Sequence, residues 1–135
     1  MTSLFIDTGA WYALFNQRDM HHQRARAFFE GLKNQRIRLF TSDYIFDETL
    51  TLLRYHAGYQ MARQFGEHFR RSKVICEVVT PEVRESAWQI FCDYEDQAFS
   101  FTDCTSFALM RMKNIQDVFA FDAHFQICGF TVHPF

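Results

Sequence analysis

Segments typical of short buried strands alternate with segments typical of helices along the whole chain of 135 residues. Strands separated by helices, with short connections between them, predict a parallel sheet covered by helices on both faces. We expect strands at residues 3–7, 37–41, 73–79, 117–121 and 130–133. We expect helices at residues 10–15, 21–33, 44–57, 59–71, 81–94 and 102–113. In such α/β sheets, functional sites form beyond the carboxyl ends of the strands.

Length and composition predict one globular domain that spans residues 1–135. No apolar run approaches the roughly 18 residues that a membrane helix needs, so no membrane partner is expected. The first residues reach Asp7 without a basic segment, which argues against a signal peptide. The four cysteines have neither zinc-type nor disulfide-type spacing, so we expect reduced, mostly buried thiols. Together these features predict a cytoplasmic protein.

Two aspartates directly follow expected strands. Asp7 comes after the apolar run Leu-Phe-Ile, and Asp122 comes after Val-Phe-Ala-Phe. Because the strands are expected to be parallel, both carboxylates should lie at the same edge of the sheet. Each aspartate has an ordinary alternative role, since Asp7 could cap the following helix and Asp122 could begin a turn.

Two further acids lie on expected helices. Glu48 has Tyr44, Ile45 and Leu52 as neighbours one turn away, so its carboxylate lies on a largely apolar face. An isolated carboxylate is costly there and needs a lysine, an arginine or a metal ion as partner. Asp103 stands at the start of a helix, where capping is again the ordinary alternative.

Considered together, the four acids favour a metal site. Converging carboxylates repel one another and raise one another's pKa unless a cation compensates their charge. Carboxylate oxygens are hard ligands, which suit Mg²⁺ or Mn²⁺. The net charge of −2 gives no general indication of nucleic-acid binding, but removing the four acids from the count leaves the remainder of the chain positive.

The segments that carry these acids resemble a known family. They read FIDTGAW at 5–11, FDETLTLL at 46–53, SFTD at 100–103 and FAFDAHF at 119–125. In order and spacing they resemble the PIN-domain proteins, and more narrowly the VapC-like ribonuclease toxins of prokaryotic toxin–antitoxin pairs. The resemblance covers essentially the whole chain. It implies a three-layer α/β/α sandwich around a parallel five-stranded sheet.

The same resemblance implies an endoribonuclease that depends on Mg²⁺ or Mn²⁺, with one or two ions. Asp7, Glu48 and Asp103 would hold the principal ion, and Asp122 would hold a second ion or orient a water molecule. Thr8 matches a hydroxyl residue that often follows the first aspartate and would support the site. Gly9 departs from the family pattern, because many relatives have serine there. Cys104 is a second departure, in a position where alanine is common.

The resemblance also implies partners. These are an RNA substrate, a cognate antitoxin protein and a second copy of the chain in a homodimer. RNA must approach a negative pocket, so basic residues should flank it, and the candidates are Arg63, Arg70, Arg71 and Lys73, with Arg36 and Arg38 as a second group. For each of them, an ordinary solvated position at a helix end or strand flank is an equal alternative.

Other functions remain open from the sequence. A catalytically silent PIN-like module that binds RNA or protein would have the same fold. Another acid-site phosphohydrolase, such as a haloacid-dehalogenase-like phosphatase, is disfavoured. Members of that family have an Asp-x-Asp pair after the first strand, whereas here Thr8 and Gly9 follow Asp7. A response-regulator receiver domain needs an early acidic pair, which this chain lacks.

Overall fold

The computed structural model describes residues 1–135 and contains a five-stranded, all-parallel sheet. The strand order is β3-β2-β1-β4-β5, so β1 lies at the centre and the chain moves outward from it in both directions. The register pairs Phe5 of β1 with Phe40 of β2 on one side and with Val118 of β4 on the other. The strands are β1 Ser3–Ile6, β2 Arg38–Ser42, β3 Ile75–Glu77, β4 Asp117–Phe119 and β5 Thr131–His133.

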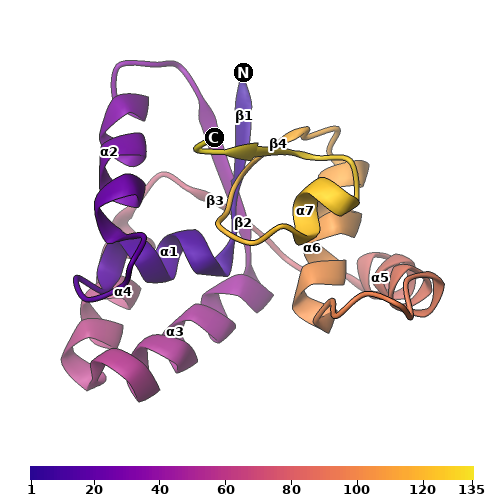
Figure 1. Cartoon of the computed structure of the whole chain (residues 1–135), viewed down its shortest axis with the longest axis horizontal. Helices are drawn as coiled ribbons and strands as arrows, with labels where there is room; N and C mark the ends of the chain where they lie inside the picture. Colours follow the sequence, from indigo (N-terminus) through magenta and orange to yellow (C-terminus); the bar gives the residue numbers. More distant parts are fainter.

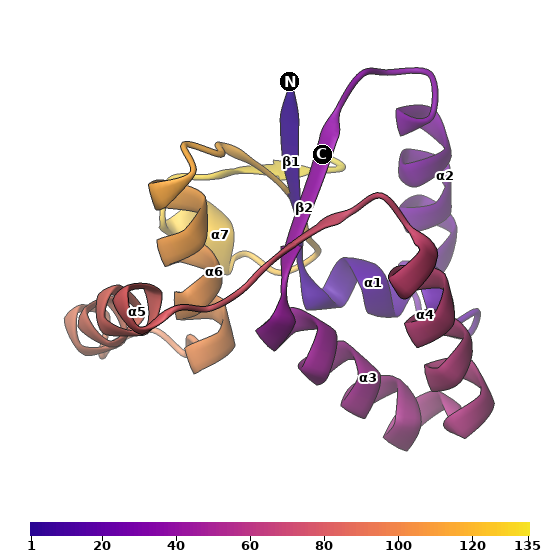
Figure 2. The ribbon, with the colours of Figure 1, turned by 180° about the vertical axis from the view of Figure 1, so that it is seen from behind.

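Seven helices cover this sheet in two layers. Figures 1 and 2 show α1 to α4 on one side of the strands and α5 to α7 on the other. The predicted three-layer α/β/α sandwich is therefore confirmed. None of the helices is both long enough and apolar enough to cross a membrane. The helices are α1 Thr8–Phe15, α2 His22–Leu32, α3 Asp43–Ala57, α4 Tyr59–Arg71, α5 Pro81–Asp93, α6 Phe101–Met112 and α7 His124–Ile127.

The helix ends follow from local side-chain chemistry. Ser42 is the N-cap of α3, and its Oγ accepts a hydrogen bond from the Ile45 amide at 3.1 Å. Thr80 caps α5 in the same way, with a proline at the first helical position. Gly58 has a φ of +94°, which glycine adopts without strain, and it separates α3 from α4. Ser42 and Gly58 thus fix where α3, the helix that carries Glu48, begins and ends.

An aromatic cluster fills the core between α1, α3 and α4. Phe65 is fully buried and makes edge-on contact with Trp11 at a centroid distance of 5.6 Å and with Phe15 at 5.3 Å. Phe69 contacts Trp11 at 5.5 Å and Phe46 at 4.8 Å. Aromatic pairs in this geometry stabilise a core beyond their buried area. The cluster therefore holds α1 and α3 in fixed positions behind the carboxyl end of β1.

Several element boundaries differ from those expected. β3 has three residues instead of the expected 73–79, because it is an edge strand that pairs only with β2 and is largely exposed. β4 ends at Phe119 instead of 121, since beyond it only the Ala120 amide bonds to β5. α1 begins at Thr8 instead of 10, and α6 begins at Phe101 with Ser100 as its cap. Helix α7, which has only four residues, was not expected from the sequence.

Candidate active site

All four predicted acids line one pocket of about 390 Å³ at the carboxyl ends of the strands. Asp7 directly follows β1, Glu48 lies on α3, Asp103 lies on the first turn of α6, and Asp122 lies between β4 and α7. The structure therefore brings together side chains from four separate segments, as the sequence predicts. The full lining of this pocket, which we call the acidic pocket, is Asp7, Thr8, Gly9, Tyr12, Glu48, Leu52, His56, Asp103 and Asp122.

Asp7 is the most buried of the four acids. It is 3% exposed, and its amide bonds to the Phe119 carbonyl at 3.0 Å, which extends the pairing of β1 with β4 by one residue. Asp7 is the N-cap residue of α1, but its side chain makes no capping hydrogen bond. Burial raises the pKa of the Asp7 carboxyl well above its ordinary value, and the charges of Asp122 and Asp103 raise it further. The capping alternative is therefore wrong for Asp7.

Glu48 is half-buried and has no basic partner. No lysine, arginine or histidine forms an ion pair with it, and its carboxylate accepts no hydrogen bond within the protein. Of the three partners that the sequence left open for Glu48, the two side-chain cations are thus excluded. The adjacent Asp47 is exposed and does not line the acidic pocket.

Asp103 combines a capping role with a place in the pocket. Its Oδ2 accepts the Ser100 amide at 3.1 Å, while the Ser100 hydroxyl accepts the Asp103 amide at 3.0 Å. This reciprocal pair is a capping box in which Ser100 is the N-cap and Asp103 is the N3 residue, so Asp103 helps to cap α6 without being its N-cap. The Asp103 side chain stays 13% exposed at the pocket.

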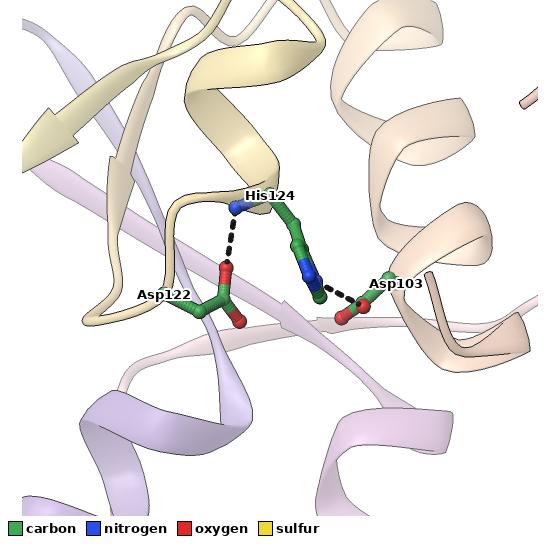
Figure 3. Close-up of side chains that lie close together, drawn as sticks. All are labelled: Asp103, Asp122 and His124. Atoms are coloured by element: carbon green, nitrogen blue, oxygen red, sulfur yellow. Dashed lines mark hydrogen bonds and ion pairs between the residues drawn. The ribbon is translucent and has the colours of Figure 1, made fainter. Parts of the chain in front are cut away.

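Asp122 also combines two roles. Its Oδ1 accepts the His124 amide at 3.0 Å, which forms the turn that leads into α7 (Figure 3). Asp122 is the most exposed of the four acids, yet partial burial of its carboxyl raises the pKa of Asp122, and the charge of Asp103 raises it further. Burial is thus the larger cause of the raised pKa of both Asp7 and Asp122, and the neighbouring carboxylates in the same pocket add to it.

A divalent cation fits this donor set. The pocket offers carboxylate oxygens from four acids and no thiol, which matches the oxygen ligands that Mg²⁺ and Mn²⁺ prefer. Thr8 adds a second observation, because its Oγ1 is buried in the pocket wall without any hydrogen-bond partner. Buried hydroxyls are normally satisfied, so this unpaired hydroxyl beside four acids is available to a ligand bound in the pocket.

Tyr12 and His56 in the pocket wall, and His124 beside the pocket, were not among the predicted site residues. The Tyr12 and His56 rings contact each other edge-on, with centroids 6.3 Å apart. His124 reaches Asp103 through its Nδ1, 3.0 Å from Oδ2. A signal for His56 was present, because residues 48, 52 and 56 repeat at a spacing of four on one helical face. For His124 the signal was its position two residues after Asp122, since the short α7 shows no periodicity.

The predicted basic residues do not line the acidic pocket. Arg63 and Arg70 line a separate groove of about 430 Å³ between α3 and α4, and Arg63 pairs with Glu67 at 2.9 Å. Arg71 bonds to the Glu67 carbonyl, and Lys73 is exposed after α4. A role of Arg63, Arg70, Arg71 or Lys73 in RNA binding therefore stays a prediction, and it would act through a surface beyond the pocket.

Comparison with known proteins agrees with this geometry. The PIN domain model matches residues 4–130. The 23S rRNA-specific endonuclease VapC20 of Mycobacterium tuberculosis is 35% identical over 128 residues, which cover 95% of each chain. A VapC ribonuclease of Archaeoglobus fulgidus is 30% identical over 125 residues, which cover 90% of this chain and 78% of that protein.

A solved structure is similar over nearly the full length. The crystal structure of Mycobacterium tuberculosis VapC20, described as a sarcin–ricin loop cleaving toxin, aligns with a TM-score of 0.88 at 34% identity and covers 95% of this chain and 96% of that chain. Family model, relatives and fold agree, and the four acids of the predicted motifs meet in one pocket. The chain therefore belongs to the PIN-domain family, within its group of VapC-like ribonuclease toxins.

Proposed function

We propose that this chain is an endoribonuclease that hydrolyses RNA phosphodiester bonds with one or two Mg²⁺ or Mn²⁺ ions in the acidic pocket. One observation carries the proposal: four carboxylates from distant segments line a single pocket, and Glu48 among them has no basic partner. Such a cluster is stable only with bound protons or bound cations. Membership of a ribonuclease family supports the choice of RNA as substrate.

Each acid has a proposed part in this site. Asp7, Glu48 and Asp103 would hold the principal ion, and Asp122 would hold a second ion or orient a water molecule. When bound, the cation supplies charge compensation for the scissile phosphate and lowers the pKa of a water molecule. No side chain needs to act as a nucleophile. The unpaired Thr8 hydroxyl is available to donate a hydrogen bond to a phosphate oxygen or to a carboxylate.

Structured ribosomal RNA is the proposed substrate class. The relative from Mycobacterium tuberculosis carries the description 23S rRNA-specific and matches this chain along nearly its whole length. The antitoxin partner, the homodimer and the cytoplasmic location that the sequence predicts stay predictions. The alternative, a catalytically silent binding module, differs from this proposal in one respect, because it would show no metal-dependent RNA cleavage.

A cleavage assay with matched variants tests the proposal. The substrate is an RNA stem-loop with the sarcin–ricin sequence, incubated with wild type or Asp7→Asn at increasing Mn²⁺ and mapped by sequencing of the new RNA ends. We expect cleavage by wild type that requires Mn²⁺ or Mg²⁺ and is absent in EDTA and in Asp7→Asn. Wild-type binding of the RNA with no metal-dependent cleavage of this or of total cellular RNA would instead identify a silent module.

A further inference from the structure

His124 lies beside the acidic pocket and contacts two of its four acids. Its Nδ1 lies 3.0 Å from Asp103 Oδ2, and its backbone amide donates to Asp122 Oδ1 at 3.0 Å. Figure 3 shows the imidazole ring between the two aspartates. The ring also packs edge-on against Phe99, with centroids 5.1 Å apart, so its orientation is fixed from a third direction.

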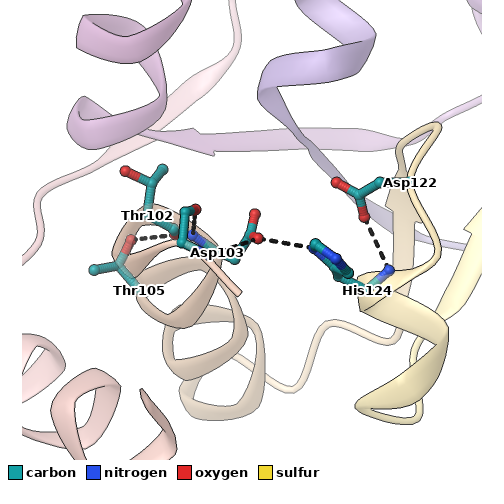
Figure 4. A network of polar contacts seen from close by, with 6 residues as sticks. Thr102, Asp103, Thr105, Asp122 and His124 are labelled. Atoms are coloured by element: carbon teal, nitrogen blue, oxygen red, sulfur yellow. Dashed lines mark hydrogen bonds and ion pairs between the residues drawn. The ribbon is translucent and has the colours of Figure 1, made fainter. Parts of the chain in front are cut away.

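The two oxygens of Asp103 have unequal surroundings. Oδ2 receives the Ser100 amide at 3.1 Å in addition to the His124 ring, whereas no hydrogen bond from the protein reaches Oδ1. Figure 4 shows Asp103 as the link between the first turn of α6 and the His124 ring. Two donors on one oxygen prevent rotation of the carboxylate, because rotation would break both hydrogen bonds at once. Asp103 is thereby held with one oxygen free to bind a cation.

We propose that His124 is a positioning residue for metal binding, which acts by holding Asp103 through an Nδ1–H donor. The inference rests on the proposed function, because it needs a cation at the acidic pocket. Partners that orient metal ligands from outside the ligand set commonly contribute about 10–100-fold to metal affinity. With Nδ1 facing Asp103, a direct ligand role could involve only Nε2, and it is disfavoured because the expected ions prefer oxygen ligands.

The test compares variants that keep or lose this donor. His124→Asn keeps an N–H on the atom bonded to Cγ, where the histidine carries Nδ1, whereas His124→Leu has no donor. His124→Gln moves the amide one bond further and serves as a polar variant if the leucine variant does not fold. The control is His133→Leu, which removes another His–Asp contact, since His133 Nε2 lies 2.8 Å from Asp117 Oδ1 outside the acidic pocket.

The measurement is Mn²⁺ affinity by titration calorimetry in the absence of RNA. We expect His124→Leu and His124→Gln to weaken Mn²⁺ binding about 10–100-fold, while His124→Asn and His133→Leu stay within about threefold of wild type. Cleavage by His124→Leu should recover at saturating Mn²⁺. Thermal unfolding of each variant without metal confirms that it is folded.

Three outcomes would overturn the inference, and they differ from failure of the proposed function. Wild-type Mn²⁺ affinity in His124→Leu shows that the contact does not support the site. Equal losses in His124→Leu and His124→Asn show that the donor is not the relevant property. A nitrogen coupling in the electron spin-echo spectrum of bound Mn²⁺, lost in His124→Leu, makes the ring a ligand. If wild type binds Mn²⁺ no better than Asp7→Asn, the proposed function itself is wrong, and the positioning role is wrong with it.

Discussion

Trp11 on α1 donates its indole Nε1–H to Thr41 Oγ1 at the end of β2, over 3.3 Å, and the Thr41 hydroxyl donates to the Ile6 carbonyl at 2.9 Å. All three residues are buried. The hydroxyl thus joins a helix and two adjacent strands directly behind Asp7. A single buried side chain satisfies two polar groups that have no access to water, and it fixes the strand end from which the most buried acid projects.

The first prediction concerns this hydroxyl. Thr41→Val keeps the shape of the side chain but leaves the Trp11 indole without an acceptor, so we expect unfolding to become easier by about 1–3 kcal/mol. Urea unfolding of wild type and variant measures the change. Thr2→Val at an exposed position is the control and should stay within about 0.5 kcal/mol of wild type. Equal stability of Thr41→Val and wild type would contradict the role of this network.

The second prediction concerns pH and Asp7. Because the pKa of Asp7 is raised in the folded protein, the folded state binds more protons than the unfolded state at pH values between the unfolded pKa, about 4, and the raised pKa. The metal-free protein should therefore lose stability as the pH increases through this range. The asparagine in Asp7→Asn cannot ionise, so the stability of this variant should depend less on pH. Urea unfolding in EDTA at several pH values measures the free energy of unfolding of wild type and of Asp7→Asn. Parallel curves of this free energy against pH for the two proteins would contradict the prediction.

Metal binding should show the same linkage. A cation competes with the proton on Asp7, so the Mn²⁺ concentration that gives half-maximal binding should increase as the pH decreases. Titration calorimetry at two pH values measures this shift, and a pH-independent affinity would argue against Asp7 as a ligand.

Much of the candidate site could be predicted from the sequence, for reasons that are physical. Asp7 and Asp122 follow apolar strands, and parallel strands bring their carboxyl ends to one edge. Glu48 interrupts an apolar helical face, where an unpaired charge needs a ligand. These arguments depend only on local pattern and sheet geometry, and both are encoded within short segments.

What could not be predicted depends on contacts between distant segments. His124 lies on a helix of four residues, too short for any periodicity, and its contact with Asp103 spans 21 residues. The absence of a basic partner for Glu48 is likewise a property of the folded chain. The prediction of mostly buried thiols was wrong in part, since Cys76 and Cys92 are exposed. Burial raises the pKa of Cys104 to about 11, in agreement with an inert thiol.

The third prediction concerns Gly9, the departure from the family pattern. Gly9 lies in α1, and a Cβ there would meet only Asp7 Oδ2, at an ordinary contact distance of 3.9 Å. Gly9→Ala should therefore stabilise the fold by about 0.5–1 kcal/mol, because glycine loses more conformational freedom in a helix than alanine. Thermal unfolding measures the gain. Gly31→Ala on α2, also without steric conflict, is the control; a loss of stability confined to Gly9→Ala would mean that the pocket does not tolerate a side chain there.

The fourth prediction compares two adjacent acids on α3. Glu48 faces the acidic pocket and Asp47 faces solvent, so Glu48→Gln and Asp47→Asn each remove one charge from the same helix, but only Glu48→Gln is expected to have an effect. Glu48→Gln should reduce metal-dependent cleavage by more than about 100-fold, above the effect typical of residues that only orient ligands. Without metal it should leave the fold intact or increase its thermal stability, because one source of repulsion on Asp7 is removed. Asp47→Asn should change neither property, and unchanged turnover in Glu48→Gln would exclude Glu48 from the mechanism.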